Sequence, residues 1–194
     1  MFYFTSIHIL SFFAKLFYRI KYVGLEHIPA EGKLIVCSNH KSIIDPLFLA
    51  VPFKRQIRYM AKSELFEDHG WLVSKLLVWL GAFPVKRDKG DARSIRTAVD
   101  ILNRQEVVGI FPQGKCVFDQ TPFRPKAGAV MLAAKTNAPI LPASIYCDGV
   151  IRLFSRVTIR FGQVIPASEF SLKDLRSSAE ILAGQINQML EEKD

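Results

Sequence analysis

The sequence predicts an α/β fold, a single domain in which helices flank a central sheet that is mostly parallel or mixed. The chain has 194 residues, enough for one domain with a real core and too few for two full-sized ones. Short β-like runs alternate with helical patterns along most of its length. Several of these runs are almost continuously apolar, as strands covered on both faces are.

The first twenty residues, MFYFTSIHILSFFAKLFYRI, contain no Asp or Glu but five Phe and two Tyr. On a helix their polar residues fall on one narrow stripe and leave a broad apolar face. This stripe consists of Thr5, His8, Ser11, Lys15 and Arg19. The pattern predicts an interfacial amphipathic helix over residues 1–22, followed by one domain over residues 23–194. A helix packed on that domain and a short membrane span remain alternatives, although the uncharged stretch is shorter than the roughly 20 residues a span requires.

Six strands and five further helices are predicted in the rest of the chain. The strands cover residues 33–38, 57–61, 82–85, 107–111, 140–145 and 157–161. Four helices are expected near residues 46–51, 70–80, 91–104 and 128–136, and the last opens at Ser171 with Asp174 in a capping-box relation. The segment 70–80 holds both tryptophans and is apolar almost all round, so it is either a core helix or one that enters lipid.

The charge and cysteine content narrow the class of protein. The formal net charge is +8, and the excess lies in residues 1–170, which hold 23 basic and 13 acidic residues. Such an excess suits an anionic membrane surface, phosphorylated molecules or nucleic acid. The three cysteines have no CxxC or Cys/His spacing, which argues against a disulfide scaffold or a zinc site and favours a reducing compartment.

The first strand leads directly into a segment that contains His40, Asp45 and Pro46. Pro46 disfavours a helical Asp45, so Asp45 is predicted to be the N-cap of the next helix. One carboxylate oxygen would cap this helix while the other accepts the imidazole N–H of His40, leaving the second ring nitrogen as a base. No Ser or Cys is obviously placed to complete a nucleophile triad. The pair would therefore deprotonate a hydroxyl of the substrate itself; the alternative is a loop histidine beside a plain helix cap.

The segment Asn39-His40-x-Ser42-x-x-Asp45-Pro46 resembles the first motif of the glycerolipid acyltransferase family, which includes the 1-acylglycerol-3-phosphate (lysophosphatidic acid) acyltransferases. Further blocks resemble the family in the same order and at fitting spacings. They read VGLEHIP at 23–29, AKSELF at 61–66, GAFPVKR at 81–87, FPQG at 111–114, KAGA at 126–129 and ILPA at 140–143. The resemblance covers roughly residues 20–165.

This resemblance implies acyl transfer from acyl-CoA or acyl carrier protein to the free hydroxyl of a lysophospholipid, with 1-acylglycerol-3-phosphate as the first choice of acceptor. His40 would be the general base, Asp45 would orient it, and Arg87, with Lys86 nearby, would bind the acceptor phosphate. No cofactor is needed beyond the acyl donor as co-substrate. The residues expected to bind substrate are Asn39, Ser42, Lys86, Arg87, Gln113, Gly114 and Lys115.

The third block, residues 111–116, departs from the family. Gln113 replaces a glutamate, Lys115 a threonine, and Cys116 the usual arginine. Gln113 removes a negative charge, whereas Lys115 offers a flexible positive charge in place of the missing arginine fork. Two further readings therefore stay open, an acyltransferase for a different lysolipid and a catalytically weak lipid-binding protein of the same fold. Cys116 is expected to be a small loop residue, with a covalent nucleophile as the alternative.

The partners expected are the lysophospholipid acceptor, the acyl donor and an anionic membrane surface. Nucleic acid is not expected, because the sequence has neither interleaved aromatic and basic strand motifs nor a recognition helix. The sequence has no recognisable cleavable secretory signal. It therefore predicts a peripheral or monotopic protein on the cytoplasmic face of a membrane, and the short chain resembles bacterial members of the family, hence the inner membrane.

Overall fold

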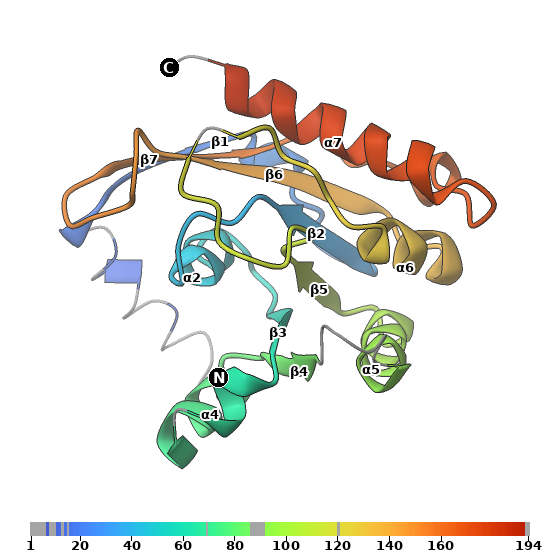
Figure 1. Cartoon of the computed structure of the whole chain (residues 1–194), viewed down its shortest axis with the longest axis horizontal. Coiled ribbons are helices and arrows are strands. Elements are labelled where there is room, and N and C mark those ends of the chain that lie inside the picture. Colours follow the sequence, from blue (N-terminus) through green and yellow to red (C-terminus); the bar gives the residue numbers. More distant parts are fainter. Residues whose placement is uncertain are drawn as a thin grey trace.

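The computed structural model describes residues 7, 11–12, 14, 16–68, 70–85, 92–119 and 121–192. Its centre is a seven-stranded sheet in the order β1-β7-β6-β2-β5-β3-β4, with helices on both faces (Figure 1). All neighbouring strands are parallel except β6 and β7, which are antiparallel. The predicted α/β fold with a mostly parallel, mixed sheet is confirmed.

The six predicted strands are present as β2 to β7, each within one residue of its predicted ends, and a seventh strand, β1, precedes them. The strands are β1 (Arg19–Val23), β2 (Leu34–Ser38), β3 (Ile57–Lys62), β4 (Phe83–Val85), β5 (Val107–Ile110), β6 (Ile140–Tyr146) and β7 (Arg156–Phe161). The helices are α2 (Asp45–Ala50), α3 (Glu64–Glu67), α4 (Gly70–Trp79), α5 (Ala92–Asn103), α6 (Gly128–Thr136) and α7 (Leu175–Glu191). Two short 3₁₀ turns, η1 (Leu25–His27) and η2 (Ala167–Glu169), complete the described elements.

The amino-terminal prediction needs one correction. Residues 19–22, assigned to the helix over residues 1–22, belong instead to β1, which pairs with β7 so that Arg19 lies opposite Arg156. Arg19 and Lys21 are thus strand residues. Thr5, His8 and Lys15 of the predicted polar stripe lie outside the described residues. Within the described part of the chain, no helix combines the length and the hydropathy needed to cross a membrane.

The last helix also begins later than predicted. Ser171 does not open it: α7 starts at Leu175, and Asp174 is its N-cap. The Asp174 carboxylate accepts a hydrogen bond from the backbone N–H of Ser177 at 3.0 Å. This hydrogen bond lowers the pKa of Asp174, since it favours the charged form.

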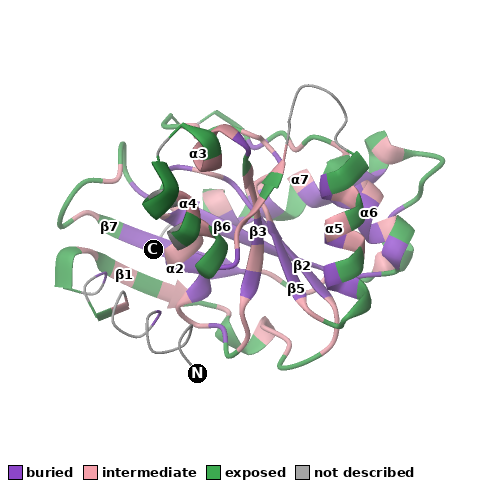
Figure 2. Cartoon of the chain, turned by 90° about the horizontal axis from the view of Figure 1, so that it is seen from below, coloured by how far each residue is buried: buried purple, intermediate pink, exposed green. Residues whose placement is uncertain are grey.

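The core has two layers because successive strand residues point to opposite faces of the sheet. In β2, Ile35 and Cys37 pack under α5, α6 and α7, whereas Leu34 and Val36 pack on the side of α2. Both faces of the central strands are thus covered, and Figure 2 shows these strands as the buried middle of the molecule. This double burial explains why β2 reads as an uninterrupted apolar run. It also raises the pKa of the Cys37 thiol.

Candidate active site

Two motif loops leave neighbouring parallel strands at the same edge of the sheet. β2 and β5 pair in register, with Cys37 opposite Ile110, so the segment after each strand starts from the same place. The backbone N–H of His40 donates to Oε1 of Gln113 at 3.2 Å, and the N–H of Val117 donates to the His40 carbonyl at 2.7 Å. Gln113 of the third block and Val117 just after it therefore hold the His40 backbone from both sides.

His40 and Asp45 meet through the turn that separates them. Nδ1 of His40 lies 2.7 Å from Oδ2 of Asp45. The same oxygen accepts the backbone N–H groups of Lys41 at 2.6 Å and Ser42 at 2.8 Å. Because the carboxylate is fully buried and accepts from Nδ1–H, Nε2 is left as the basic nitrogen of the ring. The His40 side chain keeps 14% of its surface exposed, so the ring is partly accessible.

The predicted capping role of Asp45 is wrong. Ile44 occupies the N-cap, and Asp45 is the first residue of α2, with no side-chain bond to the helix. The backbone N–H of Asp45 donates to the Ser42 carbonyl at 3.1 Å, which turns the carboxylate back toward the N–H groups of the turn. Its second oxygen, Oδ1, is buried without a hydrogen bond among the described residues.

Aromatic packing fixes the plane of the His40 ring. Phe111, the first residue of the third block, stacks on His40 with ring centroids 4.1 Å apart and 20° between the planes. Tyr59 in turn stacks on Phe111 at 6.0 Å, and its hydroxyl donates to the Pro46 carbonyl at 2.9 Å. Together with the bond at Nδ1, this stack restrains the direction in which Nε2 points.

Asn39 and Ser42, which were expected to bind substrate, make contacts within the protein. The buried Asn39 amide donates to the Ile145 carbonyl at 2.9 Å and accepts from the Ile145 N–H at 2.7 Å, joining the ends of β2 and β6. Ser42 supplies its backbone N–H to Asp45, and its Oγ lies 3.5 Å from the Ile44 nitrogen. Both residues support the shape of the turn around His40.

The remaining predicted residues fall into two groups. Gln113 touches His40 directly, and Gly114 closes the third block by donating its N–H to the Phe111 carbonyl at 2.9 Å. Gly114 has a φ of 75°, a conformation that favours glycine. Lys115 is exposed next to this turn. Lys86 and Arg87 lie outside the described residues.

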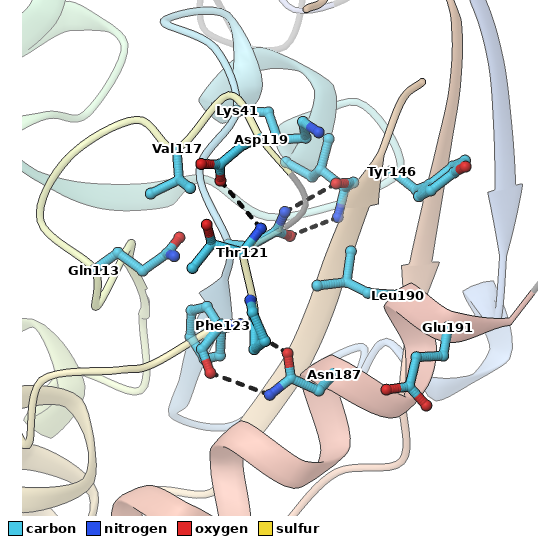
Figure 3. Close-up of a pocket in the computed structure, with 13 residues that line it drawn as sticks. Lys41, Gln113, Val117, Asp119, Thr121, Phe123, Tyr146, Asn187, Leu190 and Glu191 are labelled. Carbon is cyan, nitrogen blue, oxygen red and sulfur yellow. Dashed lines mark hydrogen bonds between the residues drawn. The ribbon is translucent and has the colours of Figure 1, made fainter. Parts of the chain in front are cut away.

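Two cavities border the turn at 111–114. The first, here called the polar cavity, has a volume of about 230 Å³ and lies between the ends of β2 and β6, the third-block loop and the end of α7 (Figure 3). The second, called the apolar cavity, has about 380 Å³ and lies over β5, α5 and α6. Its walls include Met60, Ile95, Ile110, Phe111, Met131 and Leu132. Among the described residues, no group of His, Cys, Asp and Glu could hold a metal ion.

Sequence reasoning missed Lys41, whose side chain lines the polar cavity. It occupies a position between His40 and Ser42 that the first motif leaves open, so no pattern marks it. Only the pairing of β2 with β6 shows where its side chain goes.

Comparison with known proteins identifies the family to which the chain is similar. Residues 19–146 match the Acyltransferase family. The 1-acyl-sn-glycerol-3-phosphate acyltransferase of Bacillus subtilis is 37% identical over 128 residues, which cover 64% of this chain and 61% of that protein. The protein of the same name from Borreliella burgdorferi is 29% identical over 135 residues, 66% of this chain and 51% of that protein.

A solved structure is similar over most of the chain. The crystal structure of the 1-acyl-sn-glycerophosphate (LPA) acyltransferase PlsC from Thermotoga maritima superposes with a TM-score of 0.67 and 25% sequence identity. The match covers 90% of this chain and 73% of that one. The curated relatives are longer than the matched region, which spans 61%, 38% and 51% of the first three.

Proposed function

The chain belongs to the Acyltransferase family, and from this premise we propose that it transfers an acyl group from a thioester to the free hydroxyl of a lysophospholipid. The proposed acceptor is 1-acylglycerol-3-phosphate and the product phosphatidic acid, the reaction named for its relatives. The observation that carries the proposal is the 2.7 Å hydrogen bond between His40 and the buried Asp45 carboxylate. This bond leaves Nε2 as the basic nitrogen of a partly accessible ring.

The chemistry needs one base and a good leaving group. Nε2 of His40 takes the proton of the acceptor hydroxyl while the hydroxyl oxygen attacks the thioester carbonyl carbon. The carbon–sulfur bond then breaks, and the thiolate leaves and takes up the proton, giving an ester and a free thiol. Because a thiol has a pKa of about 8.5, the leaving group needs little help from an acid.

Asp45 acts through His40. Its negative charge stabilises the imidazolium that forms during the attack, and its bonds to the N–H groups of Lys41 and Ser42 keep the carboxylate in place. General base catalysis of this kind contributes about 10²–10⁴-fold to a rate. Asn39 and Ser42 are proposed as positioning residues, since their contacts lie within the turn and at β6.

The two substrates are proposed to reach His40 from different sides. The acyl chain would enter the apolar cavity, which Phe111 joins to the His40 ring. Lys86 and Arg87 remain proposed ligands of the acceptor phosphate, with Lys115 adding an exposed positive charge. Gly114 allows the tight turn that separates the two cavities. Either acyl-CoA or acyl carrier protein could serve as the donor.

The proposed location is a membrane surface on the cytoplasmic side. Helix α4 supports contact with a membrane surface, because Trp71 and Leu72 are 66% and 67% exposed. It is therefore not the buried core helix of the alternative prediction. Lys75 lies over the Trp71 ring, 4.8 Å from its centroid. Exposed tryptophan next to lysine is typical of segments that meet lipid headgroups.

The test is release of free thiol from acyl-CoA and acyl-carrier-protein donors in mixed micelles with lysophosphatidic acid. We expect acceptor-dependent release by the native protein and a loss of roughly 10²-fold or more in His40→Ala. His27→Ala is the matched control, because His27 contacts the Phe161 carbonyl away from the site. Release that survives in His40→Ala, or no acceptor-dependent release with any lysolipid, would contradict the proposal.

A further inference from the structure

The connection between β6 and β7 presents large apolar side chains to the solvent. In residues 148–155, here called the β6–β7 loop, Val150, Leu153 and Phe154 are 46%, 61% and 63% exposed. Ile151, which lies among them, packs instead against the core and anchors the loop to the fold. Single exposed apolar residues are ordinary, but three within five residues form a patch of the kind that marks an interaction surface.

This patch continues onto the segment that precedes β1. The backbone N–H of Phe154 donates to the Phe17 carbonyl at 2.7 Å, and the N–H of Arg19 donates to the Ser155 carbonyl at 3.0 Å. Leu16 and Phe17 are themselves 57% and 39% exposed. Figure 1 shows the β6–β7 loop and the start of β1 at the same end of the sheet. The loop and this segment therefore share one apolar surface.

Phe154 has a strained backbone. Its φ of 67° lies in the left-handed region, which is unfavourable for a bulky side chain. A tight turn holds it there, because the N–H of Ser155 donates to the Arg152 carbonyl at 3.0 Å and the N–H of Arg152 donates to Oγ of Ser155 at 2.9 Å. The exposed ring gains little packing within the fold to offset this strain. A partner outside the molecule would explain why an aromatic residue stands here.

Arginines surround the same patch. Arg152 belongs to the loop, and Arg156, the first residue of β7, lies opposite Arg19 of β1. All three are exposed, and none forms an ion pair among the described residues. Like charges on paired strands repel each other unless an anion lies between them. An anionic bilayer supplies both an apolar layer for the loop and phosphate groups for the arginines.

We propose that the β6–β7 loop inserts into the surface of an anionic bilayer, with its apolar side chains among the acyl chains and its arginines at the phosphates. The inference rests on the proposed membrane location and adds a second element to it besides α4. The loop follows a residue that contacts the catalytic turn, since the Lys41 ammonium donates to the Cys147 carbonyl at 3.2 Å. A loop seated in lipid would therefore keep His40 close to the interface where a lysolipid arrives.

The first test measures partition onto vesicles of phosphatidylglycerol and phosphatidylcholine. We expect Leu153→Gln and Phe154→Asn each to lower the partition coefficient roughly 3- to 10-fold, and the double variant roughly 10- to 100-fold. Asparagine tolerates the left-handed backbone, so Phe154→Asn keeps the turn and a loss of binding is not a folding artefact. Leu172→Gln, at a leucine 56% exposed before α7, is the matched control and should bind like the native protein.

The second test separates charge from apolar insertion. Arg152→Gln and Arg156→Gln should each weaken binding to the anionic vesicles roughly 3- to 10-fold at low salt. Binding to vesicles of phosphatidylcholine alone should hardly change. Arg176→Gln, at an exposed position of α7, makes the same charge change and should have no effect. Equal losses on both kinds of vesicle would contradict the role given to the arginines.

The third test reports insertion directly. A fluorophore attached in Phe154→Cys, with Cys116→Ser as the background, should be quenched by lipids that carry a spin label on the acyl chain. The same fluorophore in Leu172→Cys should not be quenched. An unquenched signal at position 154 in protein that is bound to vesicles would overturn the proposal.

The outcomes separate this inference from the proposals on which it rests. Native binding to vesicles that the double variant of Leu153 and Phe154 retains would overturn the loop and leave the membrane location to α4. No vesicle binding by the native protein would contradict the location and the loop together. A dimer that the double variant abolishes, with vesicle binding unchanged, would identify a second copy as the partner instead. Vesicle binding through the loop without acyl transfer would contradict the proposed function and leave the loop standing.

Discussion

The two cavities beside the turn at 111–114 share a wall and differ in chemistry. Gln113 faces the polar cavity, whereas Phe111, Pro112 and Gly114 border the apolar one. One cavity lies over β2 and β6, and the other over β5, next to β2 on its opposite side. The two cavities therefore offer different surroundings on the two sides of the turn at 111–114.

The departures of this chain from the family pattern do not fall equally on the two sides. Gln113, which replaces a glutamate, lies on the polar side, while the Phe-Pro and Gly positions that border the apolar cavity keep the family residues. We therefore expect the chain to differ from its relatives in how it binds the acceptor more than in how it holds the acyl chain.

The largest effect on activity should come from a change at the Asp45 carboxylate, because His40 depends on it whichever substrate is bound. In Asp45→Asn, an amide oxygen at the Oδ2 position can still accept from Nδ1 of His40 and from the N–H groups of Lys41 and Ser42, but it carries no negative charge. The imidazolium that forms when Nε2 takes the hydroxyl proton would then lose the charge that stabilises it. We predict a fall in kcat of roughly 100-fold or more with little change in either KM.

Steady-state kinetics with each substrate varied in turn would check this prediction. Asp100→Asn, at an exposed position of α5, is the matched control and should behave like the native protein. A kcat within a few-fold of the native value would mean that Asp45 is only a structural residue of the turn.

Loss of the Asn39 side-chain bonds between the ends of β2 and β6 should lower the stability of the fold. In Asn39→Asp, the side chain can no longer donate to the Ile145 carbonyl, and the buried oxygens face each other. We predict a decrease in the free energy of unfolding of roughly 2–4 kcal/mol. Urea denaturation would measure it, with Asn103→Asp at an exposed position as the control. A decrease no larger than in this control would show that the amide contributes little.

The apolar side can be altered without a clash. A Cβ added to Gly128, which lines the apolar cavity, would meet no other atom within 4 Å. We predict that Gly128→Leu narrows the cavity and shifts the donor preference several-fold toward shorter acyl chains. Gly184→Leu is the matched control, since this glycine on α7 also has open space around it. An unchanged chain-length profile would argue that the acyl chain lies elsewhere.

The smallest effect is expected at Cys116. A direct attack by the acceptor hydroxyl needs no cysteine, so Cys116→Ser should keep acyl transfer within about twofold of the native rate. Iodoacetamide should label the half-buried Cys116 faster than the buried Cys37, because burial raises the pKa of the Cys37 thiol. A large loss of activity in Cys116→Ser would contradict direct attack and support Cys116 as a covalent nucleophile.

Most of the sheet could be predicted because strands buried on both faces are continuous apolar runs. β1 was missed because its residues alternate between exposed and half-buried, and its partner β7 is more than a hundred residues later in the chain. The approach of His40 to Asp45 could be predicted because both lie in one turn. The hydrogen-bond partners of the Asp45 carboxylate could not be predicted. Whether it accepts from the N–H groups of the turn or from those of α2 depends on the three-dimensional shape of the turn.

The polar cavity was beyond sequence reasoning for a similar reason. Lys41 faces the Cys147 carbonyl, and Gln113 faces the His40 backbone, over separations of 106 and 73 residues. Neither contact leaves a periodic pattern. Each contact depends on which strands become neighbours in the sheet, and no short stretch of sequence determines that order.

The most direct test of the account measures acceptor KM and donor chain-length preference side by side in Gln113→Glu and Gly128→Leu. We predict that Gln113→Glu raises KM for lysophosphatidic acid and leaves the chain-length profile unchanged. Gly128→Leu should shift that profile and leave the acceptor KM unchanged. If both substitutions move the same parameter, or neither moves any, the two sides of the turn at 111–114 do not divide the substrates between them and the account is wrong.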